Sequence, residues 1–285
     1  MAYLHIALSA GLSILIAHIL KVNERRNVRT LHVLTLNYVF ALAVLPFLLP
    51  EGAVLMPSVN DVFILATVVN GVLFILNFYA YSKSVDANGV GLSVAAMRMS
   101  LVIPVFFAIT QYGEPFHVGV GTGMALVLIA LGLMILRPGI SILRSINDGR
   151  LLVGMFLMSG ICDVFIKMYE RNPAPGVHDA HFVFTIYLIS MITGMTVLAV
   201  KRQLHFTRDE LRIGLWIGIP NLLTFVFMLK ALAMMPATVA FSLSHLSVVL
   251  GGTVLGKTVW KDDLRPTQWL GILLALSAIL ILIGI

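Results

Sequence analysis

The stretch from Met124 to Leu136 reads MALVLIALGLMIL and contains no charged side chain. Working outward, the apolar run extends back to Gly119, so residues 119–136 reach the roughly 17–25 residues that a membrane-spanning helix needs. The alternation of apolar and polar residues typical of a membrane β-barrel strand is absent from it. This stretch therefore predicts a helix that crosses a lipid bilayer.

The same pattern recurs along the whole chain. Only four charged residues fall inside the apolar segments, namely Arg98, Asp163, Lys167 and Lys230. The first segment is too long for the apolar part of a signal peptide and has no basic region before it, so it is interpreted as a retained helix. The sequence thus predicts an all-α integral membrane protein with ten transmembrane helices, at residues 3–20, 31–49, 62–82, 89–110, 119–136, 151–168, 181–200, 213–233, 237–256 and 267–284.

The overall composition excludes most other protein classes. Hydrophobic residues make up 59% of the 285 positions and charged residues only 11%, against about a quarter charged in soluble domains. The net charge of +6 is spread over the links between helices, so no basic patch indicates a nucleic-acid partner. The single cysteine, Cys162, cannot form an internal disulfide, and no motif for a metal, nucleotide or other cofactor is present.

Two pairs of short motifs indicate an internal repeat. Lys21-Val-Asn-Glu-Arg25 resembles Lys167-Met-Tyr-Glu-Arg171 at an offset of 146 residues. A second pair has an acid nine residues before a glycine, Glu114 with Gly123 and Asp262 with Gly271, at an offset of 148. Each half then holds five helices, and because five is odd the second half enters the membrane from the opposite side. The expected units are therefore an N-terminal repeat, 1–145, and an inverted C-terminal repeat, 146–285, within one membrane domain, as in many secondary transporters.

Basic residues are distributed very unevenly between the links. Fifteen Lys and Arg residues lie in the odd-numbered links, and one, Arg171, lies in the even-numbered links. The positive-inside rule places the odd links in the cytoplasm and both termini outside.

Several stretches resemble the drug/metabolite transporter superfamily, in particular its EamA-like bacterial members. One is Ala96-Met-Arg-Met-Ser-Leu-Val-Ile-Pro104, followed by Tyr112-Gly-Glu114 and a glycine-rich helix. Another is Lys261-Asp-Asp-Leu-Arg-Pro-Thr-Gln-Trp-Leu-Gly271, where Asp262 stands at a position at which the family more often has glutamate. A further departure is Pro115-Phe-His117 after Glu114.

The resemblance implies export or exchange of small metabolites through a central cavity, lined chiefly by helices 1, 3, 4, 6, 8 and 9. It also implies termini in the cytoplasm, opposite to the charge rule, so the orientation stays open.

Arg98 lies near the centre of the fourth predicted helix. An arginine at this depth costs at least about 2.5–3.5 kcal/mol, so it normally faces a cavity and serves function. Its planar fork of donors matches a carboxylate or phosphate. We therefore expect Arg98 to bind an acidic group of the substrate, with a structural ion pair as the alternative.

Asp163 in the sixth predicted helix has three interpretations. It precedes Lys167 by four residues, which favours a local ion pair. It is also suited to pair with Arg98 or to carry a transported proton. Lys167 and Lys230 lie near helix ends, where long side chains reach out to the interface.

Further polar residues within the predicted spans complete the candidate substrate site. Ser242 and His245 share a helical face of the ninth span, where they either line a cavity or bond another helix. Asn221 follows Gly218 and Pro220, a pairing that can open the helical ladder. The other candidates are His18, Asn77 and Tyr81.

The combined interpretation is a gradient-driven transporter or exporter of a small organic metabolite, for which Arg98 suggests an anion, working by alternating access in the bacterial inner (plasma) membrane. Coupling to protons or a counter-solute is expected, no cofactor is expected, and neither substrate identity nor oligomeric state follows from the sequence. Ser244 and His245 are adjacent on a helix and diverge by about 100°, which disfavours a nucleophile–base pair. The alternatives are an intramembrane lipid-modifying enzyme or a passive channel.

Overall fold

The computed structural model describes residues 1–24, 28–48, 57–88, 90–135, 148–259 and 266–283. Within these ranges the regular structure is helical throughout. The elements are α1 (Ala2–Glu24), α2 (Thr30–Val44), the short η1 (Leu45–Leu48), α3 (Asp61–Asn88), α4 (Val90–Met99), α5 (Val102–Tyr112), α6 (Val118–Ile135), α8 (Gly149–Arg171), α9 (Asp179–Val200), α10 (Arg208–Leu232), α11 (Ala237–Val259) and α12 (Pro266–Ile283). The predicted motif at Lys261–Asp263 falls outside the described residues.

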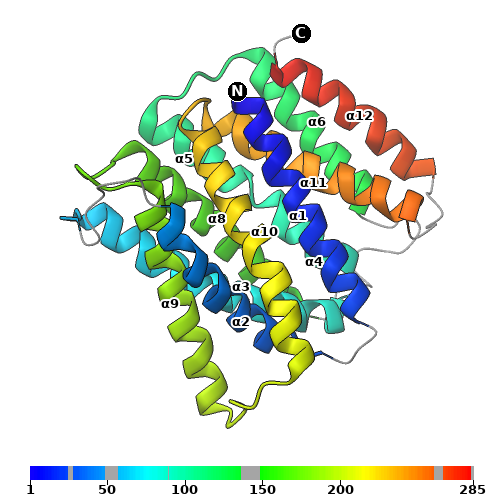
Figure 1. The fold of residues 1–285 in the computed structure, drawn as a ribbon. Helices are drawn as coiled ribbons and strands as arrows, with labels where there is room; N and C mark the ends of the chain where they lie inside the picture. Colours follow the sequence, from blue (N-terminus) through cyan, green and yellow to red (C-terminus); the bar gives the residue numbers. More distant parts are fainter. Residues whose placement is uncertain (25–27, 49–56, 89, 136–147, 260–265, 284–285) are drawn as a thin grey trace.

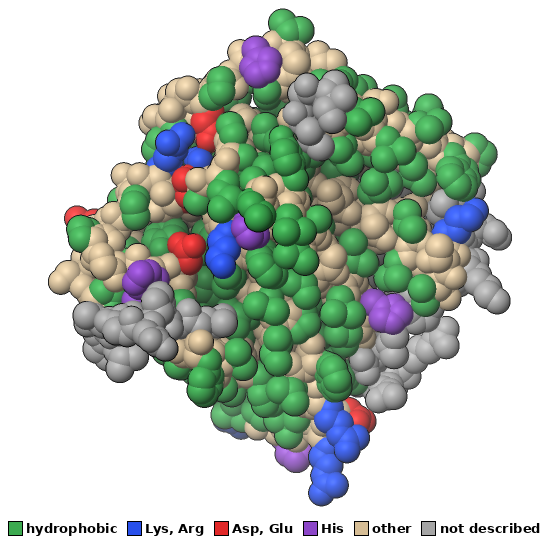
Figure 2. Space-filling view, turned by 45° about the horizontal axis from the view of Figure 1, so that its top comes forward, with side chains coloured by type: hydrophobic (Ala, Val, Ile, Leu, Met, Phe, Trp, Pro, Cys, Tyr) green, Lys and Arg blue, Asp and Glu red, His purple; other side chains and the backbone are tan. Residues whose placement is uncertain are grey.

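Seven of these helices are long and apolar enough to cross a membrane. Three shorter apolar stretches, Ala96–Tyr112, Val118–Leu133 and Pro266–Leu282, accompany them. One face of the molecule is covered mainly by hydrophobic side chains, with charged and histidine side chains in separate small groups (Figure 2). The predicted all-α membrane protein is confirmed, whereas its division into two inverted five-helix repeats stays a prediction.

The helices pack as one bundle in which the start of α1 and the end of α12 lie at the same end (Figure 1). α6 lies alongside α12, and α2 contacts α9. α1 packs on α10 while α8 packs on α3, and α2 packs on α10 while α9 packs on α3. α4 in turn contacts both α3 and α8, so these three helices lie together. Side chains of α11 reach the same region.

Small residues on α10 allow α2 to approach closely. A Cβ atom added at Gly218 would lie 2.8 Å from the backbone oxygen of Asn37, and one at Gly214 would lie 2.7 Å from the Cβ of Leu36. Packing of this kind drives helix association in lipid, where apolar area alone gives no preference for another helix. At the same contact the Asn221 Nδ2 donates to Asn37 Oδ1 at 2.8 Å.

The links at the two ends of the bundle are tied together by polar contacts. At one end, Arg29 before α2 donates to both carboxylate oxygens of Glu210, at 2.8 and 3.0 Å. At the other end, the Asn60 Nδ2 before α3 donates to the backbone oxygen of Asn172 after α8, at 3.1 Å. The links after α1 and before α10 thus share one end, as the even count of membrane crossings requires.

Candidate functional site

The fourth predicted helix is broken in its middle, and this break builds the candidate site. The sequence predicted one helix over 89–110, whereas the structure has α4 end at Met99 and α5 begin at Val102. Pro104 explains the correction, because it has no N–H to donate to the carbonyl of Ser100 and its ring clashes with that carbonyl. Arg98 therefore lies in the last turn of α4, beside the break.

The break leaves backbone carbonyls without helical partners, and α11 supplies one. The His245 Nδ1 lies 2.8 Å from the backbone oxygen of Arg98. Because a carbonyl can only accept, Nδ1 carries the hydrogen and donates it. Irregular backbone is tolerated at membrane depth only where such groups are satisfied by protein or line a cavity. His245 thus stabilises the interrupted backbone and joins α11 to α4.

The other ring nitrogen of His245 faces Asp163. His245 Nε2 and Asp163 Oδ2 are 3.7 Å apart, and both side chains are largely buried, with 10% and 19% exposed. Asp163 and Arg98 also interact electrostatically. The structure therefore brings together three predicted site residues from α4, α8 and α11.

The Arg98 guanidinium is less well satisfied than the groups around it. Among the described residues it makes no hydrogen bond and no ion pair, and Asp163 and Tyr81 are its electrostatic neighbours. A partly buried guanidinium has five donors and is costly to leave unpaired. This site can therefore accept a carboxylate or phosphate without breaking an existing ion pair.

The predicted local pair between Asp163 and Lys167 is wrong. The Lys167 Nζ lies 3.0 Å from Glu114 Oε1 and 2.7 Å from Glu170 Oε2. Lys167 also does not reach out to the interface, because only 2% of its side chain is exposed. The position of Lys167 in the helix was compatible with a pair to Asp163 and with a side chain that reaches the interface. The carboxylate of Glu114, on a distant segment, replaces both. Lys230, in contrast, is exposed near the end of α10.

Glu114, in the link between α5 and α6, acts as the cap of α11. Its two carboxylate oxygens accept hydrogen bonds from the backbone N–H groups of Ala237 at 3.0 Å and Thr238 at 3.2 Å. Burial opposes ionisation, but these two bonds together with Lys167 hold the pKa of Glu114 below its ordinary value. The Glu114–Lys167 cluster, which comprises Glu114, Lys167 and Glu170, is thus a fully paired structural site.

Asn77, Tyr81 and Ser242 lie on helices that border the Arg98 site. The Asn77 Nδ2 of α3 donates to Ser159 Oγ of α8 at 2.8 Å, one turn before Asp163. Tyr81 lies one turn after Asn77. Ser242 is fully buried one turn before His245, and its hydroxyl has no hydrogen-bond partner among the described residues. Sequence analysis missed Ser159, although its spacing of four residues from Asp163 marks the same face of α8.

Two other predicted site residues lie elsewhere. Asn221 pairs with Asn37, and its backbone oxygen accepts from the Tyr187 hydroxyl at 3.0 Å, which makes it a junction between α10, α2 and α9. His18 is half-buried near the C-terminal end of α1. In the described part of the chain no group of three His, Cys, Asp or Glu side chains could hold a metal ion.

Comparison with known proteins identifies the second half of the chain. Residues 150–284 match the model of the EamA-like transporter family. This half is similar to the EamA-like transporters. The match covers α8–α12, and with them Asp163 and His245, and it confirms the resemblance to the drug/metabolite transporter superfamily. The matched family consists of membrane transporters, which agrees with the seven helices of the described chain that are long and apolar enough to cross a membrane.

Whole-chain similarity extends further. An uncharacterized protein of Haemophilus influenzae is 25% identical over 277 residues, which cover 94% of this chain and 93% of that protein. A protein of known crystal structure is 13% identical and matches with a TM-score of 0.70 over 99% of this chain and 96% of its own. The second comparison shows that the EamA-like half and the half before it together form a known fold.

Proposed function

We propose that this protein is a gradient-driven transporter of a small organic anion in the bacterial inner membrane. The observation that carries the proposal is the Arg98 guanidinium, which lies beside a broken membrane helix without an ion-pair partner among the described residues. Its substrate would bind where α3, α4, α8 and α11 meet, with Arg98 holding the acidic group. Asn77, Tyr81 and Ser242 would contact the rest of the molecule.

Coupling to protons is the second part of the proposal. His245 donates through Nδ1, so its Nε2 and the Asp163 carboxylate share the space for one further proton. An anion bound to Arg98 adds a negative charge beside this pair and so favours uptake of that proton. The substrate and the proton would then move in the same direction.

Alternating access between two inverted repeats, 1–145 and 146–285, is the proposed mechanism. The packing supports it, because exchanging the two halves converts the contact of α1 with α10 into that of α8 with α3. The same exchange converts the contact of α2 with α10 into that of α9 with α3. Helices at these contacts would separate on one side of the membrane while they close on the other.

A thermal-shift screen of the purified protein against carboxylated and phosphorylated metabolites tests the substrate class. A ligand that binds the folded state raises the melting temperature. Metabolites that raise the melting temperature should then be taken up into proteoliposomes that contain the protein, and the lumen should become more acidic as they enter. The matched control for a variant of Arg98 is Arg150→Gln, which removes an exposed arginine at the start of α8. Flux driven only by added ATP, or turnover of a lipid without any gradient, would contradict the proposal.

Topology is tested by labelling single introduced cysteines in intact cells. Arg202→Cys and Lys257→Cys should react from one side, and Phe116→Cys and Met234→Cys from the other. The native Cys162 is buried and gives little background. Labelling also decides the orientation, on which the loop charges and the family resemblance disagree. A split within either pair would contradict the ten-helix topology.

A further inference from the structure

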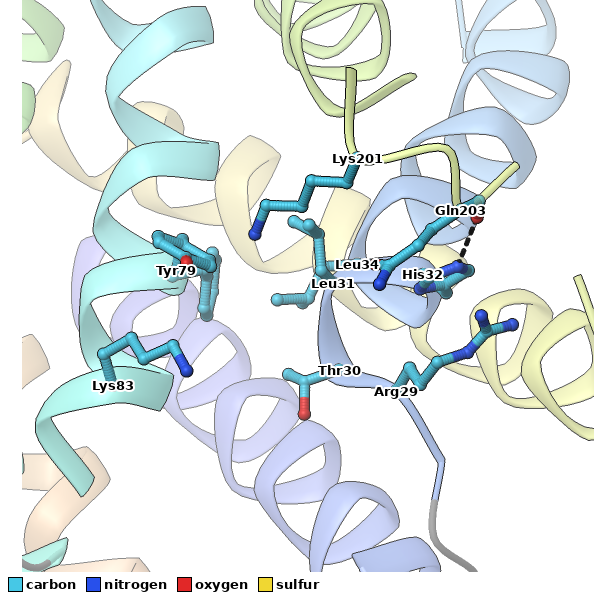
Figure 3. A pocket seen from close by; sticks show the side chains of 10 residues that line it. Arg29, Thr30, Leu31, His32, Leu34, Tyr79, Lys83, Lys201 and Gln203 are labelled. Atoms are coloured by element: carbon cyan, nitrogen blue, oxygen red, sulfur yellow. Dashed lines mark hydrogen bonds between the residues drawn. The ribbon is translucent and has the colours of Figure 1, made fainter. Parts of the chain in front are cut away.

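A cavity of about 250 Å³ lies away from Arg98, between the start of α2, the second half of α3 and the end of α9 (Figure 3). Its walls combine basic, aromatic and apolar side chains, namely Arg29, Thr30, Leu31, His32, Leu34, Phe78, Tyr79, Lys83, Lys201 and Gln203. We call it the basic pocket. It lies at the end of the bundle where Arg29 before α2 meets Glu210 of α10.

Two lysines give the basic pocket an uncompensated positive charge. Arg29 is already paired with Glu210, but neither Lys83 nor Lys201 has a carboxylate partner in the described part of the chain. The Lys201 Nζ lies 4.1 Å from the centroid of the Tyr79 ring, which holds the ammonium group in place. Figure 3 shows both lysine side chains extending beside Tyr79 toward the same space. The pocket therefore favours an anion.

The start of α2 adds donors that suit a phosphate. Its N-cap residue, Arg29, makes no side-chain capping bond, so the first N–H groups of the helix have no cap. Uncapped N–H groups at a helix start favour phosphate, and the hydroxyl of Thr30 adds another donor there. His32 is buried, and its Nε2 donates to the Gln203 oxygen at 2.7 Å, which leaves Nδ1 as an acceptor; this Nδ1 has no partner among the described residues. A hydroxyl group on the ligand would satisfy this nitrogen.

The position of the basic pocket favours a phospholipid as the source of that phosphate. Tyr79 and Leu76, one turn earlier on α3, are 38% and 40% exposed, so an apolar surface leads from the pocket along a membrane helix. Basic pockets between membrane helices are known to bind anionic lipid headgroups. We propose that the basic pocket binds a phosphate group, carried by an anionic phospholipid, as a site separate from the transport site at Arg98.

The experiment compares phosphate sources on the full-length protein in detergent. Phosphatidylglycerol, phosphatidylcholine and inorganic phosphate are titrated separately, with binding followed by native mass spectrometry and melting temperature. Phosphatidylglycerol should bind and raise the melting temperature, and phosphatidylcholine should not. Binding of inorganic phosphate without phosphatidylglycerol would show a soluble phosphate as the source and would overturn the lipid assignment. Binding of neither would overturn the site.

Variants test the residues. Lys83→Ala with Lys201→Ala should weaken phosphatidylglycerol binding about 30-fold, and Lys83→Ala alone about 5-fold, because each basic residue near a membrane contributes about 1 kcal/mol. The exposed Lys83 has no carboxylate partner in the described ranges, so its variant should fold normally. Lys257→Ala is the matched control, since Lys257 makes a similar contact with Trp269 at 4.9 Å outside the pocket. Equal binding by the double variant, or equal weakening by the control, would overturn the assignment.

Discussion

The molecule contains two buried groups of charges that differ in how fully they are paired. In the Glu114–Lys167 cluster each charge has a partner at 2.7–3.0 Å, and Glu114 also caps α11. At the Arg98 site the closest approach between Asp163 and His245 is 3.7 Å, and the guanidinium has no ion pair among the described residues. The comparison distinguishes charges that hold the fold from charges that are available to a ligand.

The largest effect is expected from breaking the paired cluster. Lys167→Met leaves the buried Glu114 and the half-buried Glu170 without their ammonium partner, which should reduce the free energy of unfolding by about 3–5 kcal/mol. Denaturation of the detergent-solubilised protein measures this loss in the free energy of unfolding. Lys230→Met, which removes an exposed lysine, is the control. Adding Glu114→Gln to Lys167→Met should recover part of the loss, and a loss below about 1 kcal/mol in the single variant would show that the cluster is not structural.

The reverse pattern is expected at the Arg98 site. Arg98→Ala should leave a folded, membrane-inserted protein but weaken binding of an anionic ligand by about 1.5–3 kcal/mol, or about 10- to 150-fold. Arg98→Lys keeps the charge without the fork and should be partly tolerated. Ligand titrations and melting temperatures separate the two effects.

An opposite outcome at this site would remove the distinction between the two groups. If Arg98→Ala unfolds the protein, and Arg98→Ala with Asp163→Ala restores stability and transport, then Arg98 belongs to a structural ion pair. The substrate site would then have to lie among the amides and aromatic residues.

Acid should weaken the paired cluster. The folded-state pKa of Glu114 lies below its ordinary value of 4.5, so its stabilising contribution is complete above that pH. The contribution is lost as the pH falls through the folded-state pKa, with a slope of at most about 1.4 kcal/mol per pH unit for one proton. Glu114→Gln should flatten this slope in acid unfolding curves, and the exposed Asp61→Asn should not. An unchanged slope in Glu114→Gln would show that other carboxyl groups dominate.

The smallest effect is expected at the amide pair of α2 and α10. A double-mutant cycle of Asn37→Ala and Asn221→Ala should give a coupling of about 0.6 kcal/mol, the average for hydrogen bonds between membrane helices. Unfolding measurements in detergent on the two single variants and the double variant give this coupling free energy. Substrate binding should persist in Asn221→Ala, and its loss would place Asn221 in the substrate site, as the sequence first suggested.

Much of the fold followed from the sequence because the apolar runs are long and nearly free of charge. The break between α4 and α5 did not, although Pro104 was visible, because membrane helices often contain a proline without being interrupted. His245 contributes here, because it supplies a partner for the Arg98 carbonyl beside the break from a position 147 residues further along the chain.

The site was predicted less completely than the fold. Depth in the membrane was enough to select Arg98 and Asp163, since charges there are costly. Depth alone could not show that Lys167 pairs with Glu114, because the sequence offered only the local spacing to Asp163 and the position near a helix end. Ser159 could have been found from its spacing to Asp163, whereas the junction at Asn221 depends on contacts between distant helices.

The hydrogen bonds that tie α11 to Glu114 and to Arg98, on either side of α5, have a mechanical consequence. Glu114, just after α5, holds the start of α11, and His245 of α11 bonds the backbone oxygen of Arg98 in the last turn of α4. Ala237 and His245 are eight residues apart, or about 12 Å along a helix. The first half of α11 thus spans the break between α4 and α5, bonded at its start to the residue that follows α5 and at His245 to the last turn of α4. A tilt of α11 that begins at the Glu114 end is therefore passed across the break to the backbone of Arg98.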